Sequence, residues 1–239
     1  MKIEDPLPDQ DRFLDRSWRQ IRTWLAVTLA RLLGARDEKS TRIVYYHGNP
    51  LIILPTVFDP MRHWSGEMLA DNLLLEDGDV VLDMGTGSGI QAISAAKKAS
   101  RVLACDINPM AVKCARVNAV LNGVEGKLEA RQSDLFESVR PDEKFDLIIF
   151  NTPFFFVTPR NPWEQAYLGG SNGEVIRGFW AGVTQHLAPG GKVEVIFSRT
   201  VAPFMFEFDE FKKTGLKPSL VIERKSLSRH CVSVYIASP

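Results

Sequence analysis

From about residue 79 to the C-terminus, hydrophobic positions alternate between short continuous runs and spacings of three or four residues. Continuous runs predict strands, and the wider spacing predicts helices. The predicted strands cover residues 80–82, 102–105, 127–131, 145–150 and 192–197, and the predicted helices residues 90–96, 110–122, 174–187 and 201–214. The unbroken apolar run at 145–150 is typical of a strand buried on both faces of a parallel sheet. Repeated strand–helix units therefore predict an α/β fold with a doubly wound sheet.

Both ends of the chain depart from this alternation. Residues 11–33 carry apolar side chains at helical spacing with arginines at other positions, which predicts an amphipathic helix ended by Gly34. We expect this helix to pack on the main domain. The alternative is a helix that recruits substrate or lies on a membrane surface, because arginines beside two tryptophans also suit an interface. Residues 43–54 predict a β-hairpin, and runs at 220–222 and 232–236 predict an antiparallel hairpin at the C-terminus.

The composition is that of an ordinary globular protein, with 239 residues of which 45% are hydrophobic and 24% charged. Such a chain can bury one sizeable core, so we expect an N-terminal helical extension over residues 1–40 and one main domain over residues 41–239. Basic and acidic residues are equal in number, 29 each, which gives no overall attraction to nucleic acid. No signal peptide or bilayer-length apolar run is visible, so we expect a cytoplasmic protein without stable membrane insertion. The three cysteines, Cys105, Cys114 and Cys231, lack metal-ligand spacing, and we expect buried free thiols and no metal site.

A glycine-rich stretch follows the first predicted strand of the main alternation. Residues 83–89 read Asp-Met-Gly-Thr-Gly-Ser-Gly and lead into the helix expected at 90–96. Glycines there allow tight backbone dihedrals and the close approach of a ligand, which predicts a loop for a nucleotide-like cofactor. The third glycine comes one place earlier than in the dinucleotide fingerprint, and the stretch instead resembles the first motif of class I S-adenosylmethionine (SAM) methyltransferases. Asp106 ends the next strand, about 20 residues further on, where a carboxylate can bind ribose hydroxyls.

A second polar stretch, Asn151-Thr152-Pro153-Phe154, comes directly after the most buried strand. The carboxyl ends of parallel strands form the binding edge of such sheets, so this stretch is expected beside the cofactor. Asn151 offers a side-chain carbonyl and Thr152 a backbone carbonyl, and together they can hold the N–H groups of a planar amide or amine. Phe154 offers a ring face for the same planar group. The stretch therefore predicts positioning of a nitrogen for methyl transfer, without a nucleophile or a metal.

Five motifs in this order resemble those of the HemK-type methyltransferases, a family that methylates a glutamine side chain of a translation release factor. They are residues 83–89, Asp106-Ile107-Asn108-Pro109, Ser133-Asp134-Leu135, Asn151-Thr152-Pro153-Phe154 and Gly169-Gly170-Ser171-Asn172-Gly173. The resemblance runs from about residue 57 to the C-terminus and is strongest to the short archaeal and eukaryotic-like branch. It implies a Rossmann-like, seven-stranded methyltransferase sheet with an antiparallel C-terminal hairpin.

The resemblance also implies roles for individual residues. The catalytic set is Asn151, Thr152, Pro153 and Phe154, with Asn151 holding the acceptor nitrogen. Within the SAM-binding set, Asp83, Gly85 and Gly87 would hold the methionine end, Asp106 the ribose and Asp134 the adenine amino group. The full SAM-binding set is Asp83, Gly85, Thr86, Gly87, Gly89, Asp106, Ile107, Asp134, Leu135 and Asn151.

Three departures from the family pattern bear on the acceptor. Thr152 stands in place of the first proline, and Phe154 in place of tyrosine. The proline-bounded loop at 55–64, expected over the cofactor mouth, lacks the acidic pair of the family.

A protein glutamine is the leading acceptor. The alternatives are an exocyclic amine of an RNA or DNA base, a planar small molecule, and a non-catalytic SAM-binding module that interacts through its N-terminal helix. The similar eukaryotic-like enzymes require a small activator subunit, and the sequence leaves open whether this protein requires one too.

Overall fold

The computed structural model describes residues 39–62, 64–198, 209–225 and 231–239, together with residues 21, 24, 25, 27, 28 and 31. The expected helix at 11–33 is described only at those six positions, all of which are helical. Of the helix expected at 201–214, residues 209–212 are helical and residues 201–208 lie outside the described residues.

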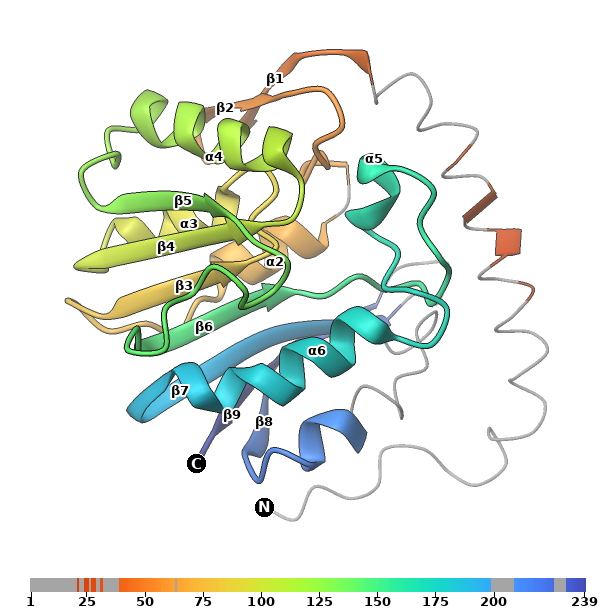
Figure 1. Cartoon of the computed structure of the whole chain (residues 1–239). Helices are drawn as coiled ribbons and strands as arrows, with labels where there is room; N and C mark the ends of the chain where they lie inside the picture. Colours follow the sequence, from red (N-terminus) through yellow and green to blue (C-terminus); the bar gives the residue numbers. More distant parts are fainter. Residues whose placement is uncertain are drawn as a thin grey trace.

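A seven-stranded sheet forms the centre of the molecule (Figure 1). In order across the sheet its strands are β5 (Leu128–Gln132), β4 (Arg101–Asp106), β3 (Val80–Met84), β6 (Phe145–Asn151), β7 (Leu187–Ser198), β9 (Cys231–Ser238) and β8 (Lys217–Lys225). The first five strands are parallel, whereas β9 pairs antiparallel with both β7 and β8. The prediction of a doubly wound α/β sheet with an antiparallel C-terminal hairpin is confirmed.

The order of the strands places a switch point in the middle of the sheet. The chain leaves β3 outward through β4 and β5 and then returns to place β6 on the other side of β3. In open α/β sheets ligands bind at the carboxyl ends of the strands beside such a reversal. The tips of β3, β4 and β6 are therefore where the fold favours a site.

Helices cover both faces of the sheet (Figure 1). One face packs against α2 (Ser65–Asp71), α3 (Ile90–Ala96) and α4 (Pro109–Leu121), and the other against α6 (Glu174–Val183). Neighbouring residues of a strand serve opposite faces, since Val81 lies in the first core and Leu82 in the second. This double burial explains why the central strands read as unbroken apolar runs.

The hairpin at the start of the main domain also matches the prediction. It consists of β1 (Arg42–Tyr46) and β2 (Asn49–Ile53), joined by His47 and Gly48 with φ of +47° and +79°. Positive φ at both loop residues is the type I′ geometry that suits the twist of a hairpin. Buried side chains of β2 extend the core of the α2–α4 face.

Two boundaries differ from the expectation. The helix expected at 174–187 stops at Val183 and continues as a 3₁₀ turn, Thr184–His186. Strand β7 begins at Leu187, so the Pro189-Gly190-Gly191 stretch lies inside a strand instead of forming a turn before it. A register shift opposite β6 accommodates it, and a Cβ at Gly191 would stand 2.8 Å from the Phe145 carbonyl oxygen. Such a bulge needs glycine, which explains why a turn signal occurs within a strand.

Two further findings concern the cysteines and the length of the helices. Cys105 and Cys114 are buried free thiols, whose pKa burial raises to about 12 and about 11. The side chain of Cys231 lies outside the described residues. Among the helices that the structure describes, none has the length and apolar character needed to span a membrane.

Candidate active site

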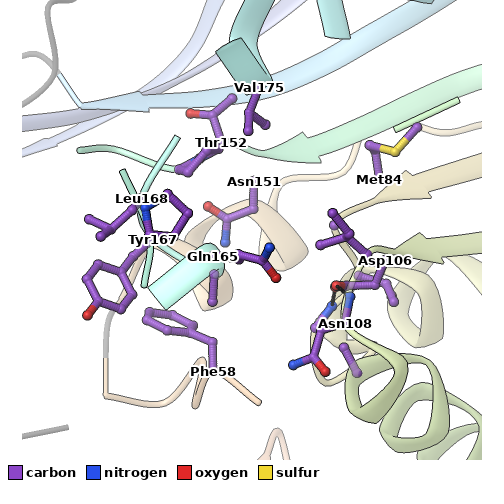
Figure 2. A pocket seen from close by; sticks show the side chains of 18 of the residues that line it. Phe58, Met84, Asp106, Asn108, Asn151, Thr152, Gln165, Tyr167, Leu168 and Val175 are labelled. Carbon is purple, nitrogen blue, oxygen red and sulfur yellow. Dashed lines mark hydrogen bonds between the residues drawn. The ribbon is translucent and has the colours of Figure 1, made fainter. Parts of the chain in front are cut away.

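A cavity of about 330 Å³ opens at the switch point of the sheet (Figure 2). Its walls include Met84, Asp106 and Asn151, the last residues of β3, β4 and β6. Further lining residues come from the stretches 56–65, 85–91, 107–111, 133–135 and 150–175. The sheet edge that the topology favours is thus the place where the chain forms a cavity.

The glycine-rich loop lines one side of this cavity through Gly85, Thr86, Gly87 and Ser88. Gly85 and Gly87 have φ of +67° and +55°, a left-handed conformation that side chains other than glycine rarely adopt. A Cβ at Gly87 would meet nothing within 4 Å, so this backbone borders open space. The loop therefore presents bare backbone to a ligand, as expected.

Asp83 lies behind the loop, outside the cavity wall. One of its carboxylate oxygens accepts hydrogen bonds from the Thr86 hydroxyl, at 2.6 Å, and from the backbone N–H of Ala92, at 3.1 Å. Complete burial raises the pKa of the Asp83 carboxyl to about 7. In this structure the Asp83 side chain fixes the loop to the first turn of α3, and its contact with a cofactor stays a prediction.

Gly89 is also absent from the cavity wall. It is the N-cap of α3, with φ of +87°, and a Cβ there would stand 3.2 Å from the Cα of Ala115 in α4. The third glycine of the motif thus allows the close contact between α3 and α4.

Ser88, which was not among the predicted site residues, does line the cavity, and its buried hydroxyl has no partner within the described part of the chain.

The Asp106 carboxylate, at the end of β4, connects the glycine-rich loop after β3 with the segment before α4. One carboxylate oxygen accepts the backbone N–H of Gly87 and the other that of Asn108, both at 2.9 Å. Burial raises the pKa of Asp106, and the two N–H donors oppose that rise. Each oxygen keeps a further lone pair for a ligand. Asp106 and the neighbouring Ile107 both line the cavity, and the contact of Asp106 with a ribose stays a prediction.

The loop before α2 reaches the cavity through a contact that the sequence analysis missed. Asn108 caps α4 with its side-chain oxygen, which accepts the Met110 N–H at 2.9 Å. Its side-chain nitrogen donates to the Thr56 carbonyl at 3.0 Å. Thr56 has φ of +64°, and Thr56, Val57 and Phe58 line the cavity. Described residues of the loop at 55–64 therefore border the cavity.

Asp134 and Leu135 line the cavity from the segment after β5. Asp134 is exposed, whereas Leu135 is half-buried with φ of +46°. The Ser133 hydroxyl donates to the Leu135 carbonyl at 2.7 Å and so holds this left-handed turn. A left-handed non-glycine residue costs about 1–2 kcal/mol, and such strain is concentrated at functional sites.

The Asn151-Thr152-Pro153-Phe154 segment lines the cavity with all four residues. The Thr152 hydroxyl donates to the Ile196 carbonyl of β7 at 2.7 Å, so this side chain is engaged with the sheet. Threonine at the position of the family's first proline thus anchors the segment to the neighbouring strand. Beyond it, Phe155 exchanges backbone hydrogen bonds with Tyr167 and Gly169, at 3.1 and 2.8 Å.

A short helix, α5 (Pro162–Gln165), places Gln165 in the cavity (Figure 2). The sequence analysis missed this element, although Asn161-Pro162 repeats the cap-and-proline pair of Asn108-Pro109. The Asn161 side chain accepts the Glu164 N–H at 2.9 Å. Four residues are too few to show a helical pattern, so only the cap could have revealed α5.

The charged side chains of the cavity wall are all acidic. They are Asp106, Asp134 and Glu174, and among the described lining residues there is no Lys or Arg. Such a wall favours neutral or cationic groups over phosphates.

Comparisons with known proteins fit this geometry. The model of the methyltransferase small domain matches residues 52–207. A Methanocaldococcus jannaschii protein, named provisionally as a protein N5-glutamine methyltransferase, is 36% identical over 163 residues, which cover 65% of this chain and 79% of that one. The release factor glutamine methyltransferase of Koribacter versatilis is 30% identical over 206 residues, with 77% and 72% covered.

A solved structure of similar fold is the E. cuniculi Mtq2–Trm112 complex, described as responsible for the methylation of the eRF1 translation termination factor. The likeness has a TM-score of 0.59 at 21% identity and covers 77% of this chain and 98% of that one. At this identity it shows a shared fold. The family match and the two relatives show more: the chain belongs to the methyltransferase small domain family of SAM-dependent methyltransferases, as its HemK-type motifs implied.

Proposed function

We propose that this protein transfers the methyl group of SAM to the side-chain nitrogen of a protein glutamine. One observation carries the proposal: Asn151 and Thr152 at the tip of β6 line the same cavity as Asp106 and the glycine-rich loop. An acceptor nitrogen and a methyl donor can therefore meet in one enclosed space. The names of the two relatives, both glutamine methyltransferases, support the choice of acceptor.

The residues around the loop fit a SAM molecule. Bare backbone at Gly87, where a Cβ would meet nothing within 4 Å, leaves room for the methionine end. The buried Ser88 hydroxyl has no partner among the described residues, so a ligand could bind it. Asp106 can accept ribose hydroxyls while it keeps its two backbone donors. Asp134, Leu135 and Ile107 would border the base. Asp83 and Gly89 would act on the shape of the loop.

On the acceptor side, the Asn151 side-chain oxygen and the Thr152 backbone carbonyl would each accept one N–H of the acceptor amide. Phe154 would lie against the plane of that amide, and Pro153 packs on Gly169, where a Cβ would be 3.1 Å from the proline ring. SAM, when bound, supplies an electrophilic methyl group on a sulfonium. The nitrogen lone pair forms the new N–C bond as the C–S bond breaks, its electron pair stays on sulfur, and the nitrogen loses one proton to water. Positioning is the main contribution of these residues.

The acidic cavity wall supports a protein acceptor over a nucleic acid. Phosphates near Asp106, Asp134 and Glu174 would be repelled, and no described lining residue offers a positive charge to offset this. A neutral amide meets no such penalty.

A small partner subunit belongs to the proposal as well. The E. cuniculi structure of similar fold is a complex with Trm112. We therefore expect an assay in lysate of the source organism, which would supply such a subunit, to give higher turnover than an assay of the purified chain alone.

Asn151→Ala tests the proposed role. The protein is incubated with methyl-labelled SAM and host lysate, and wild type should place label in protease-sensitive material, on glutamine. Because Asn151 acts in positioning, the variant should lose about 100-fold in turnover while its affinity for SAM, measured by calorimetry, stays unchanged. Asn72→Ala is the matched control, since it removes an amide at the C-cap of α2 that donates to the Met68 carbonyl and does not line the cavity.

Two outcomes would contradict the proposal in different ways. Nuclease-sensitive or filterable label would reassign the acceptor to a base or a small molecule. Full turnover in Asn151→Ala would remove the positioning role.

A further inference from the structure

Four side-chain amides line the cavity, and they differ in what they bind. Gln91 donates to the Gly66 carbonyl at 3.3 Å, and Asn108 bonds both Thr56 and Met110. Asn151 and Gln165, in contrast, make no hydrogen bond through their amides within the described part of the chain. In Figure 2 both amides point into the same space between β6 and α5. These two amides are therefore the ones available to a ligand.

We infer that Gln165 is the second half of the acceptor site and binds the carbonyl oxygen of the acceptor amide. This inference rests on the proposed function. An acceptor glutamine has two N–H groups and one carbonyl oxygen to satisfy. In the arrangement proposed above, the Asn151 side-chain oxygen and the Thr152 carbonyl bind the two N–H groups, so the carbonyl oxygen needs a donor of its own. The Gln165 side-chain nitrogen is such a donor on the opposite wall.

The short helix that carries Gln165 is held firmly from outside the cavity. The preceding residue, Glu164, is 4% exposed and accepts two hydrogen bonds from the Arg31 guanidinium, at 2.8 and 3.1 Å. It also accepts the Arg160 N–H at 2.9 Å. A bidentate, charge-assisted pair of this kind fixes orientation as well as position. Arg31 thus ties α5 to the N-terminal segment and acts on Gln165 as a positioning residue.

An apolar cluster also connects the N-terminal segment with the region of α5. Val27, at 3% exposed, packs with Tyr167 and Leu168, and Trp163 borders this cluster. Tyr167 in turn accepts the backbone N–H of Phe155, next to the Asn151 segment. Residues 27 and 31 of the N-terminal segment therefore support the acceptor side of the cavity, and their contacts lie away from the glycine-rich loop.

The chemistry of an amide predicts which kinetic constant depends on Gln165. A donor on the carbonyl oxygen draws electron density from the nitrogen and so does not raise its nucleophilicity. The hydrogen bond is present in the ground state and the transition state alike, which is uniform binding. Loss of Gln165 should therefore raise KM for the acceptor and leave kcat unchanged.

Gln165→Leu and Gln165→Glu test the inference. The substrate is purified release factor of the source organism, and methylation of glutamine is read by peptide mass spectrometry. Both variants remove the donor, so KM should rise about tenfold with kcat within twofold and SAM affinity unchanged. Arg31→Leu should show the same split to a lesser degree. Gln185→Leu, on the 3₁₀ turn outside the cavity, is the matched control and should leave KM unchanged.

The experiment separates the two proposals. If wild type modifies no glutamine of the release factor, the proposed function fails. If wild type modifies it and both Gln165 variants keep the wild-type KM, or lose kcat at constant KM, the role of Gln165 is wrong.

Discussion

Glu194 carries a buried carboxyl group of which one oxygen has a hydrogen-bond donor among the described residues and the other has none. It points from β7 toward the segment after α2, where one oxygen accepts the Leu74 N–H at 2.9 Å. The other oxygen is buried without a partner among the described residues. Burial raises the pKa of Glu194 from 4.5 to about 7. The folded protein therefore holds a proton that the unfolded chain has already lost.

This pKa shift predicts how stability depends on pH. Between pH 4.5 and about 7 the folded state binds more protons at Glu194 than the unfolded state does, so the free energy of unfolding falls as pH rises. The full loss is roughly 3 kcal/mol above pH 7. Glu194→Gln cannot ionise, so in urea titrations its free energy of unfolding should fall less across this range than that of wild type. Asp83, whose pKa is also raised, contributes equally to both proteins and cancels in the difference.

Glu125→Gln provides the control for Glu194, because it changes an exposed carboxyl on the loop after α4. Its pH dependence should follow that of wild type. Parallel curves for Glu194→Gln and wild type would show that Glu194 titrates alike in both states.

At the scale of elements, the contact between α3 and α4 depends on Gly89. An alanine there meets two penalties, a left-handed backbone at φ +87° and a Cβ 3.2 Å from Ala115. Gly123, after α4, has φ of +67°, but a Cβ there would meet nothing within 4 Å, so an alanine at this position meets the backbone penalty alone. Gly123→Ala should cost roughly 1 kcal/mol of unfolding free energy and Gly89→Ala roughly 2–3 kcal/mol. Denaturant titration of both variants measures the difference, and equal losses would show that helix packing does not require this glycine.

Sequence patterns predicted those elements whose burial produces a local pattern of hydrophobic residues. The strand at 145–150 was recognisable because both of its faces are buried, and Asn151 was placed in the site because it ends that strand. Helix α5 was not recognisable, since its position depends on Arg31, more than a hundred residues away. Long-range contacts of this kind leave no local periodicity.

The same reasoning explains which contacts of the site the sequence did not predict. Asp83 sits in a cofactor motif, but the direction of its side chain is set by Thr86 and Ala92 within the folded turn. The loop at 55–64 was expected beside the site, but the hydrogen bond from Asn108 to Thr56 that ties it there could not be predicted. Residues at strand tips could therefore be predicted, whereas the contacts that fix the loops required the structure.

At the scale of the whole molecule, the charge distribution distinguishes a protein acceptor from RNA. The chain has no net charge, and the described wall of its cavity carries acids but no Lys or Arg. A protein that reads RNA releases counterions from phosphates, so its affinity falls by about 10³–10⁵ between 50 and 200 mM salt when it makes six to ten phosphate contacts. Among the described residues that line the cavity, none carries the positive charge that such contacts need.

Fluorescence anisotropy with bulk RNA tests this expectation. Because binding near the cavity would bring phosphates close to Asp106, Asp134 and Glu174, we expect weak association whose dependence on salt is shallow. Excess RNA should also leave methylation of the release factor unchanged, since it would not occupy the cavity. A steep salt dependence together with inhibition by RNA would instead place a phosphate-binding surface beside the acceptor site, and the exocyclic amine of a base would then replace glutamine as the acceptor.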